Sequence, residues 1–150
     1  MSAPSSLDAH LGFLLRMVSN AVSHNFARKL ADEGVTVAEW VMLRAMFDKD
    51  EITPSVLADE LGMTRGAISK LADRLAGKHL ITRTADPDDR RGQLLALLPA
   101  GRALVPLLAN HADRNDAEYF ELLCAPERFA LAQTLRKLIA GRNSHIAPLD

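Results

Sequence analysis

Apolar residues along the chain recur mainly at a helical spacing, so the fold is predicted to be mostly α. Between Leu7 and Leu30 they stand at positions 7, 11, 14, 18, 21 or 22, and 26, which predicts one long, bent helix over 7–30. Gly34 is expected to end this helix. Thr36 precedes a further apolar stripe that includes Trp40, so we expect it to cap a second helix.

Two short helices joined by a tight turn are predicted in the middle of the chain. Thr53-Pro54 is typical of a helix start, and Gly62 is expected to end this helix. Thr64 then caps the next helix, whose predicted buried stripe consists of Ile68, Leu71, Ala72 and Leu75. With so short a connection the two helices must cross steeply, as in a helix-turn-helix.

After Lys78 the spacing changes toward that of strands. Residues 80–84 and 93–98 are predicted to form the two arms of a hairpin, around a loop that contains Asp-Pro-Asp-Asp-Arg-Arg. Pro99 and Gly101 are expected to break the second arm, and helical spacing resumes at Arg102. A last amphipathic helix is predicted from Pro126, followed by a frayed tail over 143–150.

Length and composition are those of one globular unit, with 150 residues, 48% hydrophobic and 25% charged. The longest apolar runs fall short of the roughly 20 residues that span a bilayer, and the first six residues lack the pattern of a signal peptide. We therefore expect a cytoplasmic protein without a membrane partner. One cysteine and five histidines with no metal-ligand spacing predict neither a metal site nor a cofactor.

The net charge of −1 conceals a basic segment. Between Thr64 and Arg91 there are seven basic and four acidic residues, a net charge of +3. A nearly neutral chain with one basic face is what local binding to a polyanion requires.

The order of helix, short helix, tight turn, helix and charged hairpin is that of a winged helix-turn-helix. The sequence resembles the MarR family of bacterial transcriptional regulators through LADELGMTRGAISKLADRLAGKHLITR and the following DPDDRRGQLLALLPAGRAL, and the resemblance covers about Leu7 to Gly141. The family commonly has Gly where His79 stands. Because His is among the residues that tolerate a positive φ, we expect the turn there to survive.

The helix after Thr64 is predicted to be the recognition helix. Its buried stripe turns the polar side chains outward, and its N-terminus suits phosphates. Arg, Ser and Thr there can reach base edges in a major groove, and Gly66 allows a close approach to DNA. The expected DNA-binding residues of this helix are Thr64, Arg65, Gly66, Ser69, Lys70 and Arg74.

The hairpin tip is predicted to be the wing. A hairpin is narrow enough to enter a minor groove, where A·T-rich stretches attract arginine. We expect Arg90 and Arg91 to supply that charge and Asp89, or Asp88, to orient a guanidinium. Asp89-Arg90-Arg91 matches the wing signature Asp-x-Arg of the family, which by resemblance favours Arg91 as the minor-groove residue.

The resemblance also implies a homodimer on a pseudo-palindromic operator. Residues 36–98 are expected to form the winged helix-turn-helix DNA-binding lobe, and 7–30 with 102–141 a helical dimerisation region, within a single MarR-like chain of residues 1–150. The first helix and the terminal helices carry more apolar positions than one winged domain can cover, which favours the dimer over a monomer. The fold class expected is thus mostly α with a β-hairpin wing.

Members of the MarR family usually respond to a small phenolic or other lipophilic anion, so a ligand-released repressor is the expected function. Phe13, Met17, Trp40 and His111 are candidates for the effector pocket, although a core position is the simpler interpretation of Trp40. The peroxide-sensing branch of the family uses a cysteine in its first helix, and none stands there. Cys124 is expected to be an inert, partly buried thiol.

Two other functions compete with a DNA-binding regulator. A winged helix can serve as a protein-interaction module without specific DNA binding, but that would not require arginines at both the helix tip and the wing tip. An enzyme is not expected, because the sequence has no Gly-rich phosphate loop and no nucleophile elbow.

Overall fold

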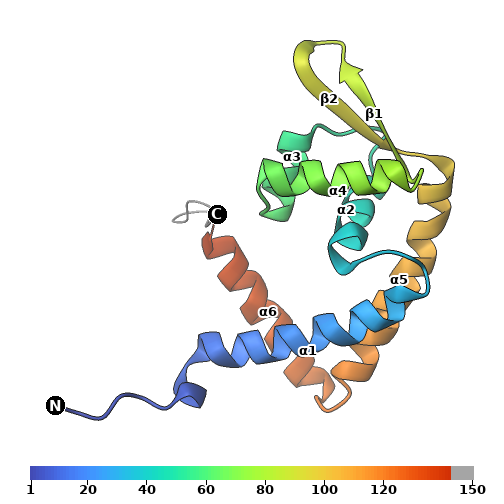
Figure 1. The fold of residues 1–150 in the computed structure, drawn as a ribbon. Coiled ribbons are helices and arrows are strands. Elements are labelled where there is room, and N and C mark those ends of the chain that lie inside the picture. The colour runs from blue at the N-terminus through green and yellow to red at the C-terminus, as the bar shows by residue number, and fades with distance from the viewer. Residues whose placement is uncertain (143–150) are drawn as a thin grey trace.

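The computed structural model describes residues 1–142, and there it consists of six α-helices, a 3-10 turn and one two-stranded hairpin (Figure 1). This confirms the predicted fold class. The predicted frayed tail, 143–150, lies outside the described residues. In chain order the elements are the 3-10 helix η1 (Leu7–Ala9), α1 (Leu11–Ala31), α2 (Val37–Phe47), α3 (Pro54–Leu61), α4 (Arg65–Gly77), β1 (Ile81–Asp86), β2 (Asp89–Leu97), α5 (Pro99–Tyr119) and α6 (Ala125–Arg142).

Three sets of predicted boundaries are wrong. The strands extend closer to the hairpin tip than expected, because β1 runs to Asp86 and β2 begins at Asp89, within the segment predicted as loop. The first helix does not run unbroken from Leu7, because a 3-10 turn precedes α1, which begins at Leu11. The helix expected from Arg102 begins at Pro99, with Pro at its first position, so Gly101 lies inside α5 instead of breaking a strand. Proline is compatible with a first helical position because the N–H that it lacks would have no partner there.

Local hydrogen bonds start and stop the helices where the sequence predicts. Thr36 Oγ1 accepts from Glu39 N at 3.1 Å and Glu39 Oε1 accepts from Thr36 N at 3.2 Å, which makes a capping box. Thr53 Oγ1 accepts from the N–H of Val56 at 3.3 Å and caps α3. Gly62 ends α3 with a φ of 63°, in the left-handed region where glycine has no Cβ clash.

The hydrophobic core lies beneath α4. All four residues of the predicted stripe, Ile68, Leu71, Ala72 and Leu75, are buried. They meet Met42 and Leu43 of α2 and further core residues from the ends of the long helices, Phe26 and Leu30 of α1 and Val105 and Leu108 of α5. The first part of α5 therefore belongs to the core of the winged lobe, although the sequence assigned it to the dimerisation region.

The wing is an antiparallel hairpin whose regular pairing runs from Ile81 opposite Leu97 to Ala85 opposite Gln93. Beyond that the register shifts, so that Asp86 faces Asp89 and residues 90–92 bulge out of β2. At the base, Ile52 and Leu95 exchange both backbone hydrogen bonds, each 2.9 Å long. The base of the wing is thus fixed in the core, while its tip extends away from it (Figure 1).

An ion pair between an exposed lysine and a buried glutamate joins the end of α4 to the start of α2. Glu39 is 1% exposed, and its Oε2 accepts from Lys78 Nζ at 2.7 Å. The same ammonium donates to the carbonyl of Gly34 at 2.7 Å. Next to it, His79 adopts a φ of 59°, which confirms that the turn tolerates histidine in place of glycine.

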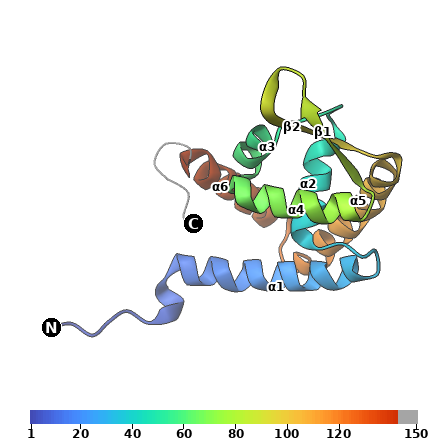
Figure 2. The same cartoon turned by 45° about the horizontal axis from the view of Figure 1, so that its top comes forward.

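The helices divide into two regions in space. The winged lobe of α2, α3, α4 and the hairpin lies on one side, and α1 runs along the other, with α5 connecting them (Figure 1). After a turn of the view, α4 lies across the face of the lobe, and α1 runs below it (Figure 2). The wing and α1 thus lie at opposite ends of the molecule.

At Gly101 helix α5 passes very close to the backbone of Leu80. A Cβ added there would lie 2.2 Å from the carbonyl oxygen of Leu80, which itself accepts from Leu98 N at 2.9 Å. Both groups belong to the backbone, so no side chain can move aside to make room. This glycine is required by packing at the junction of α5 and the winged lobe.

Gly101→Ala should therefore lower the free energy of unfolding by about 1–3 kcal/mol, the usual cost of overpacking. Urea unfolding at matched protein concentration measures this difference. Gly77→Ala is the control, because nothing lies within 4 Å of its added Cβ, and alanine should stabilise a helix by up to about 1 kcal/mol. Equal stability of Gly101→Ala and the parent would show that the backbone yields at this junction.

Candidate nucleic-acid interface

One face of α4 is buried and the other is open to solvent. The six residues predicted to contact DNA from this helix are all exposed. Thr64 Oγ1 accepts from Ala67 N at 3.1 Å, so this side chain caps the helix and holds its first turn in place. A Cβ on Gly66 would meet only Thr64 Oγ1, at 3.9 Å, so packing within the chain does not require glycine there.

The tip of the wing is organised by two aspartates that bind the main chain. Asp86 Oδ1 accepts from Asp88 N at 2.9 Å, and Asp89 Oδ1 accepts from Arg91 N at 3.0 Å. Asp89 thus binds the backbone N–H of Arg91 through one carboxylate oxygen, and the expectation that Asp89, or Asp88, orients a guanidinium stays a prediction. These two hydrogen bonds hold the turn and the bulge at residues 90–92, where Arg90 and Arg91 are exposed.

A hollow of about 460 Å³ lies between α4, the wing and the start of α3. It brings together three of the predicted residues, Arg65 from α4 and Asp89 and Arg91 from the wing. Sequence reasoning missed its other polar lining, namely Thr53, Ser55, Asp86 and Gln93. Thr53 was identified as a helix cap, but only the folded chain shows that the start of α3 faces the wing.

The hollow is lined by charges of both signs. Two guanidinium groups from different elements border it, and the N-terminus of α3 adds the positive end of a helix dipole. Asp86 and Asp89 also border it, and one oxygen of each is already held by a main-chain N–H. Arginine pairs well with phosphate oxygens because its planar fork donates several hydrogen bonds.

Comparison with known proteins decides the family. The MarR family model matches residues 33–92, from just before α2 to the tip of the wing. A putative transcriptional regulatory protein for the hcr operon of Thauera aromatica is 31% identical over 134 residues, which cover 89% of this chain and 81% of that protein. The chain belongs to the MarR family of transcriptional regulators.

Two solved MarR-family structures have the same fold. BpsR of Bordetella bronchiseptica, whose DNA binding is regulated by 6-hydroxynicotinic acid, superposes with a TM-score of 0.84 at 28% identity, covering 91% of this chain and 97% of its own. A variant of Escherichia coli MarR in complex with operator DNA superposes with a TM-score of 0.80 at 28% identity, covering 85% and 92%. As a MarR-family member the chain is a transcriptional regulator and not an enzyme.

The four predicted effector residues of this MarR-family chain are not gathered in one place. Trp40 is half-buried and packs edge-on against Phe26, with ring centroids 6.2 Å apart. His111 Nε2 lies 3.3 Å from Glu33 Oε1, near the end of α1. Phe13 and Met17 lie in the first half of α1, about 20 Å and about 14 Å respectively from Phe26 along the helix axis. Their role stays a prediction.

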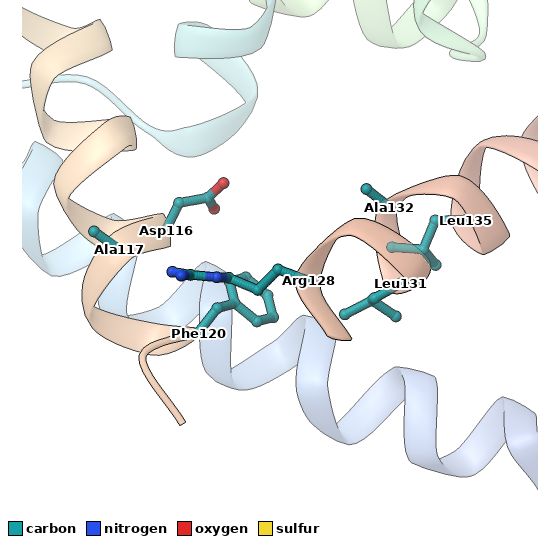
Figure 3. A pocket seen from close by; sticks show the side chains of 7 residues that line it. All are labelled: Asp116, Ala117, Phe120, Arg128, Leu131, Ala132 and Leu135. Carbon is teal, nitrogen blue, oxygen red and sulfur yellow. The ribbon is translucent and has the colours of Figure 1, made fainter. Parts of the chain in front are cut away.

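Two largely apolar hollows lie instead beside α6. One of about 340 Å³ is bordered by Asp116 of α5, by Phe120 just after α5, and by Leu131 and Leu135 of α6. Arg128 extends from α6 toward α5 (Figure 3). A second, of about 580 Å³, is walled mainly by leucines from α1, α6 and the end of α5. Both belong to the segments that the sequence assigned to dimerisation.

Cys124 is exposed, which corrects the expectation that it is partly buried. Its backbone N–H donates to Glu127 Oε1 at 3.1 Å, at the start of α6. Hydrogen bonding from Cys124 lowers the pKa of the Glu127 carboxyl below its usual value. Among residues 1–142 no group of three potential metal ligands occurs, and no helix there is long and apolar enough to cross a membrane.

Proposed function

We propose that two copies of this MarR-family chain bind one pseudo-palindromic operator and repress transcription, and that a small lipophilic anion releases them. The observation that carries the proposal is the hollow in which Arg65 of the recognition helix and Arg91 of the wing face the same space. A helix tip and a hairpin tip placed this way can enter a major groove and the neighbouring minor groove of one duplex.

In this docking, α4 reads bases and the wing reads groove shape. Arg65, Ser69 and Lys70 lie on the exposed face of α4, where they reach base edges or phosphates. Arg91, with Arg90 beside it, enters a narrow A·T-rich minor groove. Thr53 and Ser55 at the start of α3 then lie against the sugar-phosphate backbone between the two grooves.

Dimerisation is supported by apolar surface that one chain leaves uncovered. Helix α6 contains no buried residue, and several large apolar side chains of α1 and α6 are more than half exposed, among them Leu11, Met17, Phe129, Leu138 and Ile139. Exposed apolar surface of this extent marks an interaction site. We infer that 7–30 and the part of 102–141 beyond the lobe core pair with the same segments of a second copy, leaving 36–98 to bind DNA.

The class of effector is inferred from a relative and from the chemistry of this chain. BpsR responds to a hydroxylated aromatic acid. The hollow of Figure 3 combines an apolar wall with the cation of Arg128, a pairing that suits such an acid. The other proposed location of the effector is the set predicted from the sequence, Phe13, Met17, Trp40 and His111.

Fluorescence anisotropy with labelled duplexes tiled across the DNA upstream of the gene for this chain tests the proposal. We expect saturable binding to one tile at two chains per duplex, with unlabelled random duplex as competitor. Aromatic acids added to that complex should release the duplex. Failure at every tile, even at low salt, would favour a protein partner instead and contradict the DNA-binding interpretation of the wing.

Leu138→Glu gives the matched test of the dimer within this experiment. It places a charge on the uncovered face of α6, so that binding at two chains per duplex should be lost. Val41→Glu is the control, because Val41 is also exposed but lies on α2, in the winged lobe. If both variants lose binding, the cause is general destabilisation of the protein, and α6 is then not supported as the dimer interface.

Arg65 and Arg91 should contribute differently to recognition. Arg65→Ala should reduce discrimination between bases in the major groove by about 1–3 kcal/mol. Arg90→Ala combined with Arg91→Ala should weaken binding chiefly to duplexes with A·T-rich flanks. Arg44→Ala, an exposed arginine on α2 paired with Asp48, controls for the loss of charge. A wing variant that binds as tightly as the parent would refute the proposed role of the hairpin.

A further inference from the structure

An acidic side chain stands on the surface that is proposed to face DNA. Asp73 lies on the exposed side of α4 among Lys70 and Arg74, and its side chain is 70% exposed. An acid in this position repels phosphates and lowers affinity unless it has another role. Its partner identifies that role: the guanidinium of Arg83, in the first strand of the wing.

Arg83 connects three elements with its three nitrogens. Nη1 donates to Asp73 Oδ1 on α4, while Nε and Nη2 donate to Gln93 Oε1 on β2 at 3.1 and 2.8 Å. In the register of the hairpin Arg83 faces Leu95, so Gln93 lies two residues closer to the wing tip on the same side. The guanidinium therefore ties the two strands together and ties both to the recognition helix.

The outer part of the wing has few other contacts, although its base is held by the backbone hydrogen bonds between Ile52 and Leu95. Ile81 and Leu95 are buried at its base, but most residues from Thr84 to Gln93 are exposed. Among the hydrogen bonds and ion pairs within residues 1–142, the contact between Arg83 and Asp73 is the only one that joins the hairpin to α4. A two-stranded hairpin is at best marginally stable by itself, so one such contact has a large influence on where its tip lies.

We propose that Arg83 is a positioning residue that holds the wing against the recognition helix, with Asp73 and Gln93 as its anchors. Arg65 and Arg91 are then held at a fixed separation. Because of this, the helix can select bases while the wing selects A·T-rich flanks on the same duplex. This inference rests on the proposed DNA binding by the helix and wing. It explains why a carboxylate stands among the cations of α4.

Removing the negative charge of Asp73 distinguishes a role in positioning the wing from a purely electrostatic effect on DNA affinity. Asp73→Asn takes one negative charge away from the basic face, so electrostatics alone predicts tighter binding. Positioning predicts the opposite for recognition: the wing loses its anchor on α4, and the preference for A·T-rich over G·C-rich flanks falls toward unity. Arg83→Lys should do the same without any change of net charge, because a single ammonium cannot replace the planar fork.

The first measurement is hydrogen exchange of the full chain without DNA. Amides of the wing between Arg83 and Gln93 should exchange faster in Asp73→Asn and in Arg83→Lys than in the parent, and amides of α2 and α3 should not change. Unchanged exchange in the wing would overturn the proposal. Since no duplex is present, this result decides whether Arg83 holds the wing even if the proposed DNA binding fails.

The second measurement is the ratio of affinities for two operators that differ only in their flanks. The parent must bind the operator with a preference for A·T flanks, and absence of any binding would contradict the proposed function. If the parent binds, a ratio of affinities near unity in both variants supports the positioning role of Arg83. Tighter binding by Asp73→Asn with the parent's flank preference retained would overturn it and leave Asp73 as a merely unfavourable charge.

Discussion

Burial of one stripe of α4 determines most of what this chain can do. Ile68, Leu71, Ala72 and Leu75 pack into the lobe core, so the opposite side of the same helix must face outward. The helix is fixed at both ends, by the cap of Thr64 at its start and by the Lys78 ammonium at its end, bound to buried Glu39. A rigid helix with an obligatory polar face is the requirement for reading a groove, because side chains on it reach DNA in one defined arrangement.

Features set by neighbouring residues were predicted well from the sequence. The caps at Thr36, Thr53 and Thr64, the left-handed stop at Gly62 and the regular part of the hairpin all follow from local rules. The start of α5 was placed too late, because Gly101 was taken for a strand breaker. Only the folded chain shows that glycine stands there to let the helix pass the carbonyl of Leu80.

Features that depend on distant segments could not be predicted in this way. The hollow brings the start of α3 to the wing, and Arg83 joins residues of α4 and β2 that lie ten positions away on either side. Asp73 lies outside the buried stripe of its helix, but nothing near it in sequence indicates a partner. The exposure of Cys124, in the connection between α5 and α6, was likewise not predicted from apolar spacing.

Despite its net charge of −1, the chain is proposed to bind a polyanion through one localised basic face. The dependence of operator affinity on salt concentration tests this claim most directly, because each phosphate neutralised releases bound counterions. If about 6–10 phosphates are contacted by the two helices and wings, affinity should fall about 10³–10⁵-fold between about 50 and 200 mM salt. An affinity that does not change with salt would contradict the account.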